Sequence, residues 1–299
     1  MDQIHLMKVF VAVGELESFA AASRRLGISP AAVTRAVTAL EERLGVKLLL
    51  RTTRSVRLTE AGGRYLDDSR HILASLTEAN EAVAGVNATP KGNLAVTAPV
   101  LFGKFYVMPC IVDYLKTFPD VDVTAYFLDR VVNVVEEGMD VAVRIGHLPD
   151  SGLKAIGVGK VRRMICASPE YLVRHGMPQR PGDLSEHVII AANNLSPLAD
   201  WRFSTSGEPT SLRLKPRLSV TSNDAAISAA RDGLGIVRQM SYQVAEDVAN
   251  GTLKVLLDEF EEAPWPIHVL HRESKYGSTK VRTFIDRLVE HLRAHQHLN

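Results

Sequence analysis

The sequence has only two cysteines, Cys110 and Cys166, among its 299 residues, which argues against a disulfide framework. No run approaches the 18 consecutive apolar residues that a membrane-spanning helix needs. The first residues, MDQIHLMKVF, lack the basic segment and apolar stretch of a secretory signal. We therefore expect a cytoplasmic protein with no membrane partner.

Motifs for catalysis and for cofactor binding are also missing. There is no GxSxG, Walker A or CxxC pattern, and Gly157-Val-Gly159 lacks the third glycine of a dinucleotide site. His291, His295 and His297 have loose metal-like spacing, but no cysteine or carboxylate completes the set, which favours a frayed terminal segment. The apolar surroundings of both cysteines favour core positions over a redox pair. We expect no enzyme activity, no cofactor and no metal.

Positive charge is concentrated in one segment, although the formal net charge of the chain is only +1. Between Ser23 and Leu58 there are eight basic and two acidic residues. The basic residues are Arg24, Arg25, Arg35, Arg43, Lys47, Arg51, Arg54 and Arg57. A polyanionic partner is the simplest reason, because such side chains displace counterions from phosphates. A solvated basic face is the alternative on charge alone.

Two short helices are predicted on either side of a tight glycine turn. Ser18 precedes Phe19–Leu26 as a cap, and Gly27 supplies a left-handed exit. Ser29-Pro30 then gives a second cap with proline at the first helical position. This arrangement is typical of a helix-turn-helix.

The second predicted helix, from Pro30 to Leu44, separates its side chains by type. An apolar stripe is formed by Val33, Val37, Leu40 and Leu44. The opposite side carries Ala31, Thr34, Arg35, Thr38 and Glu42. Small and hydrogen-bonding side chains permit close approach to base edges in the major groove, whereas a purely structural helix more often carries lysine and glutamate there. We predict DNA contacts from Ser29, Pro30, Ala31, Thr34, Arg35 and Thr38.

A β-hairpin wing is predicted after this helix. Val46–Leu50 reads as an apolar strand, 51–55 as a basic turn, and Val56–Leu58 as a second strand. Arg54 would lie at the tip, where it can reach the minor groove or a phosphate. Arg51, Arg54 and Arg57 complete the predicted DNA contacts.

The segment from Phe10 to Gly62 resembles the DNA-binding domain of LysR-type transcriptional regulators. The resemblance rests on SFAAASRRLGISPAAVTRAVTALEERLGVKLLLRTTRSVRLTEAG, and ALEERLGVKLLLR followed by LTEAG is its most specific part. Leu49 departs from the phenylalanine usual in the family, which affects wing packing rather than readout. VTAPVLFGK, DRVVNVVEEGMDVAVRIGHLPDSGL and ASPEYLVRHG make the chain most similar to the CrgA-like subgroup.

A helix capped by Thr59 is predicted to run from near Glu60 to about Val86. Seven mostly apolar positions along it, from Tyr65 to Val86, are spaced 4, 3, 4, 3, 4, 3, which is a heptad seam. Pairing with the same helix of a second chain would cover the seam, as the resemblance also implies; packing on its own C-terminal domain is the alternative. The predicted dimer contacts are Tyr65, Ile72, Leu76, Ala79 and Val83, with Ser69 and Val86 completing the seam. The resemblance implies a homodimer and, by pairing of dimers, a homotetramer.

From Leu94 onward, strands and helices alternate, which predicts a mainly parallel sheet covered by helices. The first series is Leu94–Ala98, a helix Phe102–Phe118, Val121–Phe127, a short helix Val131–Glu137, and Val141–Ile145. The second contains Arg163–Ala167, Val188–Ala191, Leu218–Val220, a helix Asp224–Asp232 and Gly235–Arg238. Pro266–His271 and a final helix Lys280–His295 follow.

The fold class expected overall is α+β and multidomain. A winged helix-turn-helix at 1–58 and a linker helix at 59–88 precede an effector domain at 89–299, which by resemblance is two-lobed and like the periplasmic binding proteins. The resemblance implies that the chain crosses between the lobes twice. Lobe I would comprise about 91–161 and 267–299, and lobe II about 162–266.

Ligands of open α/β sheets lie beyond the carboxyl ends of strands. This rule gives the predicted effector residues Pro99, Val100, Leu101, Phe102, Asp129, Arg144, Gly146, Trp201, Ser222 and Asn223. Arg144 follows a strand that looks buried, where an unpaired charge is expensive. It either pairs with a carboxylate such as Asp129 or receives an acidic ligand, and both readings stay open.

We therefore predict a sequence-specific transcriptional regulator that binds double-stranded DNA and responds to a small-molecule effector, with organic acids as one candidate class. One alternative is an α/β enzyme or solute-binding protein with an incidental helix-turn-helix. The other is an architectural DNA-binding protein without a ligand, whose α/β region serves only in oligomerisation.

Overall fold

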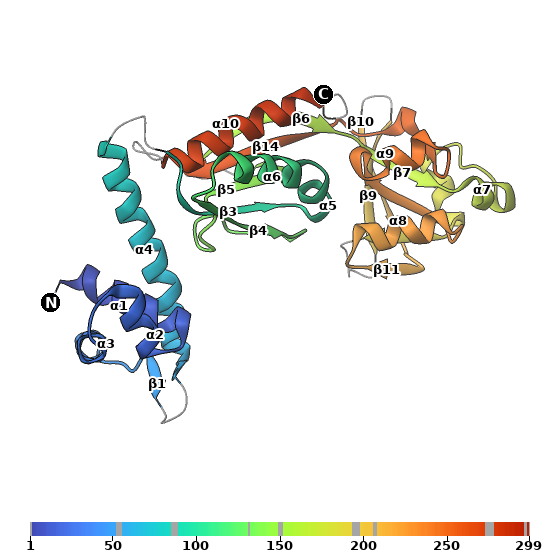
Figure 1. Cartoon of the computed structure of the whole chain (residues 1–299). Coiled ribbons are helices and arrows are strands. Elements are labelled where there is room, and N and C mark those ends of the chain that lie inside the picture. Colours follow the sequence, from blue (N-terminus) through green and yellow to red (C-terminus); the bar gives the residue numbers. More distant parts are fainter. Residues whose placement is uncertain are drawn as a thin grey trace. The chain divides into compact units, whose positions relative to one another are not determined.

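The computed structural model describes residues 2–51, 56–84, 89–130, 132–148, 152–192, 198–205, 208–272, 278–295 and 298. Side chains at 51, 71, 74, 75, 77–84 and 205 are not part of the description. The chain divides into two compact units, with the boundary at Thr89 (Figure 1). Each unit has its own apolar core.

The first unit consists of helices and one small hairpin. Its elements are α1 (Gln3–Leu16), α2 (Phe19–Leu26), α3 (Pro30–Leu44), β1 (Leu49–Arg51), β2 (Val56–Leu58) and α4 (Glu60–Ala84). The predicted caps are present: Ser18 Oγ accepts from the Ala21 amide, and Ser29 Oγ accepts from the Ala32 amide, each at 3.2 Å. Gly27 adopts a φ of 65°, which a side chain would disfavour.

The core of this unit lies where α1, α2 and α3 meet. Phe10 of α1 and Val33, Val37 and Leu40 of α3 are fully buried. Leu44, the last member of the predicted stripe, is exposed because it lies at the end of α3. No helix is predicted at α1, although Leu6, Phe10 and Val13 recur there at helical spacing, and β1 begins three residues later than the strand expected from Val46.

Lobe I of the second unit is a five-stranded sheet in the order β4-β3-β5-β14-β6. Its strands are β3 (Gly92–Ala98), β4 (Val121–Phe127), β5 (Val141–Ile145), β6 (Leu153–Val161) and β14 (Trp265–Arg272). Its helices are α5 (Val100–Phe102), a π-helical turn (Gly103–Val107), α6 (Met108–Thr117) and α10 (Thr279–Ala294). Gly103 is required there, because a Cβ would lie 2.4 Å from the Phe127 ring.

Lobe II repeats this plan with a sheet in the order β11-β8-β12-β7-β13 and a separate hairpin of β9 and β10. Its strands are β7 (Arg163–Ala167), β8 (Ile189–Ala192), β9 (Ala199–Thr205), β10 (Glu208–Leu214), β11 (Leu218–Val220), β12 (Ile236–Met240) and β13 (Lys254–Leu256). Its helices are α7 (Pro169–His175), α8 (Asn223–Arg231) and α9 (Ser241–Ala249), with short 3-10 turns at Pro181–Glu186 and Asp258–Phe260.

Both sheets are mixed, so the expectation of mainly parallel sheets is wrong. In lobe I, β3 runs parallel to β4 and β5, but β14 is antiparallel to β5 and β6. In lobe II, β8 is parallel to β11 and β12, whereas β7 is antiparallel to β12 and β13. The chain passes from lobe I to lobe II after Val161, the last residue of β6, and returns before Trp265, the first residue of β14. The antiparallel strands β7 and β14 are thus the first strands after these two crossings.

The short helix predicted at Val131–Glu137 is also wrong, because residues 132 and 133 have no regular structure and residues 134–138 form a turn. The Asn133 side chain accepts from the amides of Val135 and Glu136, and the Glu137 carboxylate accepts from the Asn133 amide at 3.1 Å. Local side-chain bonds of this kind compete with the backbone bonds of a helix.

Candidate functional site

The outward side of α3 is open to solvent. Ser29, Pro30, Ala31, Thr34 and Arg35 are exposed, and Thr38 is half-buried. The Thr34 hydroxyl donates to the Pro30 carbonyl at 3.0 Å and keeps its acceptor positions free for another group. Arg35 forms no ion pair with any described residue. The face therefore has the exposure and the small side chains that groove contacts require.

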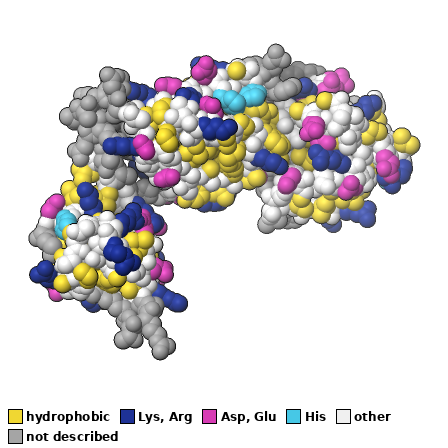
Figure 2. All heavy atoms as spheres, in the orientation of Figure 1, with side chains coloured by type: hydrophobic (Ala, Val, Ile, Leu, Met, Phe, Trp, Pro, Cys, Tyr) yellow, Lys and Arg dark blue, Asp and Glu magenta, His cyan; other side chains and the backbone are white. Residues whose placement is uncertain are grey.

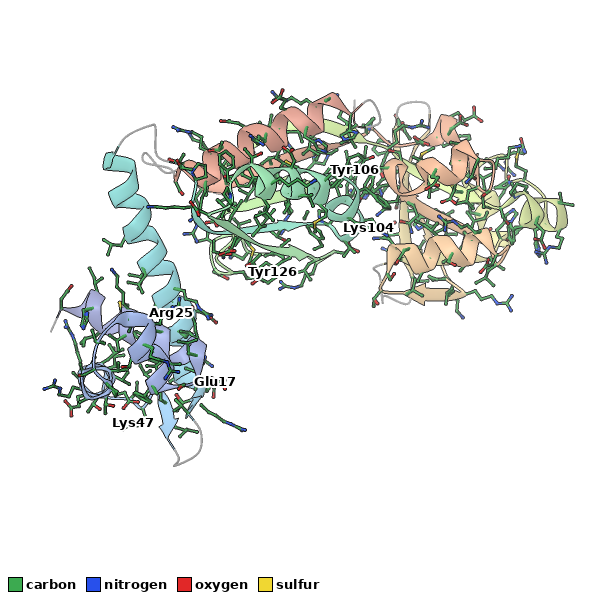
Figure 3. The ribbon with its side chains drawn as sticks, in the orientation of Figure 1. Glu17, Arg25, Lys47, Lys104, Tyr106 and Tyr126 are labelled. Carbon is green, nitrogen blue, oxygen red and sulfur yellow. The ribbon has the colours of Figure 1, made fainter. Side chains whose placement is uncertain are left out.

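Not every arginine of the basic segment is available for a partner. Arg25 forms an ion pair with Glu15 at 2.7 Å, and Arg70 of α4 contacts the same carboxylate at 3.2 Å. Arg25, labelled in Figure 3, therefore helps to join α2 to α1 and α4. Arg24 and Arg43 are exposed, and Lys and Arg side chains lie at several places on the visible surface of this unit (Figure 2).

Glu41 belongs to the basic segment but has a structural role that charge counting misses. Its side chain is only 2% exposed, and Oε1 accepts from the amides of Leu48 and Leu49 at 3.0 and 3.1 Å. Lys47 lies 2.8 Å from Oε2. Burial raises the pKa of Glu41, but the bonds from Lys47 and the two amides outweigh it and leave the pKa lowered. Glu41 thus anchors the start of the wing on α3.

The predicted wing is only partly described. Arg57 is exposed on β2, opposite Leu50 on β1. The side chain of Arg51 and the whole of Arg54 fall outside the described residues. Leu49, the departure from the family pattern, is buried in the core of the first unit.

The first residues of the predicted seam of α4 pack within the first unit. Tyr65 packs against Phe10 with ring centroids 5.6 Å apart, and Ser69 is fully buried. Farther along, Ile72 is 48% exposed and Leu76 is half-buried. The side chains of Ala79 and Val83 fall outside the description, as does Val86. Ile72 and Leu76 are thus the described seam residues that a second chain can reach.

One predicted effector residue, Asp129, joins the two lobes. Its Oδ1 accepts from the Val100 amide at 3.0 Å, and its Oδ2 accepts from Asn223 Nδ2 at 3.1 Å. Ser222 caps α8 through the Ala225 amide and also contacts Asp224. A protein carboxylate therefore already binds the amide at the start of α5.

Arg144 does not pair with Asp129, which removes that alternative for this structure. Its guanidinium donates to the carbonyls of Val132 and Val143 and forms no ion pair with a described carboxylate. Burial lowers the pKa of Arg144, against the raising effect of the Glu137 charge. The side chain is half-buried, and the two carbonyls compensate its charge only in part.

Two further polar groups lie on the same face of the lobe I sheet as Arg144. His268 is the cross-strand partner of Arg144, and Thr97 is that of Ala142. Among the residues that the structure describes, the Thr97 hydroxyl and His268 Nδ1 are buried and have no hydrogen-bond partner. Burial and the nearby His147 lower the pKa of His268, which favours the neutral ring. The sequence pattern does not single out Thr97 or His268.

The remaining predicted effector residues have different positions. Pro99 and Val100 are accessible, whereas Leu101 and Phe102 are buried in the core. Gly146 has a φ of 115°, a conformation that strains any other residue, and a Cβ there would lie 3.2 Å from the Trp265 ring. Trp201 is 5% exposed in the core of lobe II, beside Arg238.

Comparisons with known proteins agree with this geometry. The family model described as "Bacterial regulatory helix-turn-helix protein, lysR family" matches residues 4–63, and "LysR substrate binding domain" matches residues 87–293. The chain belongs to the LysR family of transcriptional regulators. It is 32% identical to the regulator CrgA of Neisseria meningitidis serogroup B, over 96% of each chain.

Solved structures extend this likeness over the whole regulator. The CrgA structure from Neisseria meningitidis matches with a TM-score of 0.62 at 32% identity, covering 96% of this chain and 98% of that one. Full-length AphB of Vibrio cholerae, a virulence activator, matches with a TM-score of 0.61 at 27% identity, covering 97% and 99%. The predicted CrgA-like character is confirmed, as is the predicted fold class of an N-terminal helix-turn-helix followed by a C-terminal effector domain.

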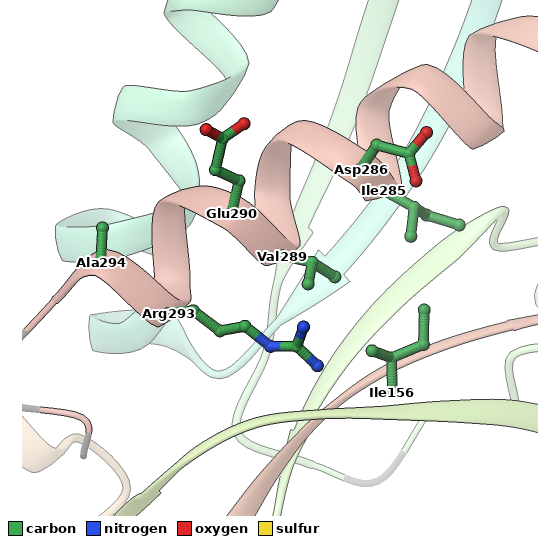
Figure 4. A pocket seen from close by; sticks show the side chains of 7 residues that line it. All are labelled: Ile156, Ile285, Asp286, Val289, Glu290, Arg293 and Ala294. Carbon is green, nitrogen blue, oxygen red and sulfur yellow. The ribbon is translucent and has the colours of Figure 1, made fainter.

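A hollow of about 530 Å³ lies in lobe I of this LysR-type regulator, between α10 and β6 (Figure 4). Ile156, Ile285 and Val289 give it an apolar lining, with Asp286 and Glu290 beside them. Arg293 reaches toward β6 and donates to the Gly157 carbonyl at 2.8 Å (Figure 4). None of the predicted effector residues lines this hollow.

Both cysteines of the regulator are buried. Burial raises the pKa of the Cys110 thiol to about 11 and that of the Cys166 thiol to about 12. In the part of the chain that the structure describes, no three or more His, Cys, Asp or Glu side chains group as a metal site. Within the same residues, no helix is long and apolar enough to cross a bilayer.

Proposed function

We propose that this LysR-type regulator reads its operator with the outward side of α3. Ser29, Pro30, Ala31, Thr34, Arg35 and Thr38 would contact the major groove, and Arg51, Arg54 and Arg57 would supply charge to phosphates or the minor groove. The exposure of the described members of this set supports the proposal. Access to chromosomal DNA would place the regulator in the cytoplasm. We also propose that the chain consists of a DNA-binding domain at 1–58, a linker helix at 59–88 and an effector domain at 89–299.

We propose that α4 pairs with the same helix of a second chain. Ile72 and Leu76 are apolar and accessible, which supports a contact in the C-terminal part of the predicted seam. Such pairing would bring two α3 helices to a two-fold-related site. A tetramer would need a second interface. The apolar residues Phe105, Met108 and Val112, in the π-helical turn and α6 of lobe I, are exposed and available for such an interface. Figure 2 shows hydrophobic side chains gathered on that lobe.

We infer that the effector carries a carboxylate and binds at the face of lobe I that holds Arg144. The observation that supports this most is that Arg144 is half-buried without an ion pair to a described carboxylate. The buried Thr97 hydroxyl and His268 Nδ1 on the same face likewise have no hydrogen-bond partner among the described residues. A carboxylate would compensate the charge and accept hydrogen bonds. Binding alters DNA affinity only if the effector prefers one arrangement of the lobes.

The test is calorimetric titration of the full chain with a panel of organic acids and matched neutral amides. We expect an acid to bind with saturation and Arg144→Met to weaken it at least about tenfold, since a charge-assisted bond is worth about 1.5–3 kcal/mol. Arg213→Met, which changes an exposed arginine of β10, is the matched control. If no acid binds and DNA affinity is the same with every compound, the ligand-independent architectural role is favoured.

A further inference from the structure

Two histidines face each other at the end of α10. His291 lies in the last turn, and His295 directly follows the helix. Their Nε2 atoms are 3.3 Å apart, and their rings are nearly perpendicular, with centroids separated by 4.7 Å. The expectation of a frayed segment is wrong for these two residues, because His295 donates its amide to the Leu292 carbonyl and receives a bond from the Leu298 amide.

We propose that His291 and His295 form a two-histidine chelate for a divalent transition metal of the zinc type. In a tetrahedral zinc site with Zn–N bonds of about 2.0–2.1 Å, two ligand nitrogens are about 3.3 Å apart. The observed distance between the two Nε2 atoms has this value. Imidazole nitrogen suits zinc, copper and nickel, whereas magnesium prefers oxygen.

Packing holds the two rings in this geometry. The His295 ring contacts the Tyr106 ring edge to face, with centroids 5.0 Å apart. Leu292, between the histidines, and Leu298, after them, are both fully buried. The backbone that carries both imidazoles is therefore fixed on each side, which lowers the entropy that a metal must remove on binding.

The place of the pair on the helix favours a cation. The last carbonyls of a helix carry a partial negative charge, and α10 is 16 residues long. The nearby Arg293 directs its guanidinium to the Gly157 carbonyl of β6. A metal at the two imidazoles would thus experience the favourable end of the helix dipole.

The proposed site is open rather than fully enclosed by protein. The described residues offer no third histidine, cysteine or carboxylate in a metal-binding group, so water would complete the coordination. We therefore expect one metal per chain, with weaker binding as the solution is acidified, since each ligand nitrogen must be unprotonated.

A metal bound by His291 and His295 would lie next to a contact between the lobes. Tyr106 of lobe I packs against Tyr242 of α9 in lobe II, with ring centroids 5.9 Å apart, and Phe102 contacts both rings. Figure 3 labels Tyr106 at the end of lobe I that faces lobe II. A metal that fixes the His295 ring would restrain Tyr106, the residue of this aromatic cluster that His295 contacts.

The experiment uses the full chain without an affinity tag, treated with a chelator and then titrated with Zn²⁺ alone in a calorimeter. We expect one saturable site per chain, no comparable binding of Mg²⁺, and at least about tenfold weaker zinc binding in His291→Gln and in His295→Gln. His5→Gln, which changes an exposed histidine of the first unit, is the matched control and should bind as the unchanged chain does.

Circular dichroism and thermal unfolding without metal check that each variant is folded. Zinc should raise the melting temperature of the unchanged chain and of His5→Gln, but not that of the His291→Gln/His295→Gln double variant. A chain that binds no zinc would refute the proposal, because the 3.3 Å contact would then be an ordinary N–H···N bond. Zinc binding that persists in the double variant would refute it equally.

Discussion

Asp129 in lobe I and Asn223 in lobe II are joined by a hydrogen bond of 3.1 Å between Oδ2 and Nδ2. The other oxygen of Asp129 accepts from the Val100 amide at the start of α5. One carboxylate therefore ties a helix start in one lobe to the first residue of α8 in the other. A change in the arrangement of the lobes would therefore alter this bond.

We expect Asp129→Ala and Asn223→Ala to be coupled in their effects on stability. Each should destabilise the C-terminal unit, and the double variant should fall short of the sum by about 0.5–1 kcal/mol, because both changes remove the same partly exposed bond. Denaturant unfolding of the four proteins measures this energy. Strictly additive changes would show that the bond contributes nothing.

Arg35→Ala should impair the recognition of specific DNA. If Arg35 contacts a base, its loss should cost about 1–3 kcal/mol on the operator and much less on random DNA, since only the operator contact depends on sequence. Fluorescence anisotropy with both duplexes measures the difference. Arg43→Ala, at the exposed far end of α3, is the matched control. Equal losses on both duplexes would assign Arg35 to phosphate contact instead.

Ile72→Asp should break the proposed pairing of α4 helices. Ile72 is 48% exposed, so the change should leave the single chain folded while placing a charge in an apolar seam. Sedimentation velocity should show a shift to smaller species than the unchanged chain forms. Asp68→Asn, also exposed on α4, serves as control and should sediment as the unchanged chain does. An assembly that tolerates Ile72→Asp would place the interface elsewhere.

Glu41→Ala should destabilise the first unit by about 2–3 kcal/mol, because it leaves the buried amides of Leu48 and Leu49 without an acceptor. Lys47→Met, which alters only the exposed partner, should cost less than about 1 kcal/mol. Chemical denaturation of the two variants compares these losses.

The same carboxylate predicts a pH dependence. The folded pKa of Glu41 is lowered, so its contribution is present above the pKa of the unfolded chain and is lost as the pH falls through the folded value. Unfolding between neutral and acidic pH should therefore show a smaller loss of stability in Glu41→Gln than in the unchanged chain. An identical pH profile in both proteins would contradict the role of the Glu41 charge.

Local sequence features predicted much of the first unit. The caps at Ser18, Ser29 and Thr59 and the left-handed Gly27 depend on residues close in the chain, and all four have the predicted roles. The outward side of α3 follows from helical periodicity in the same way. In the second unit, most strands lie within a few residues of their expected bounds for the same reason.

Tertiary structure decided what depends on partners distant in the chain. Asp129 bonds across 94 residues to Asn223 instead of pairing with Arg144, and nothing in either local segment specifies that choice. Thr97 and His268, whose buried polar atoms have no partner among the described residues, come together on one face only once β3, β5 and β14 lie side by side. The spacing of His291 and His295 is visible in the sequence, but only the packing of His295 on Tyr106 fixes how the two rings meet, because side-chain orientation is set by contacts rather than by order along the chain.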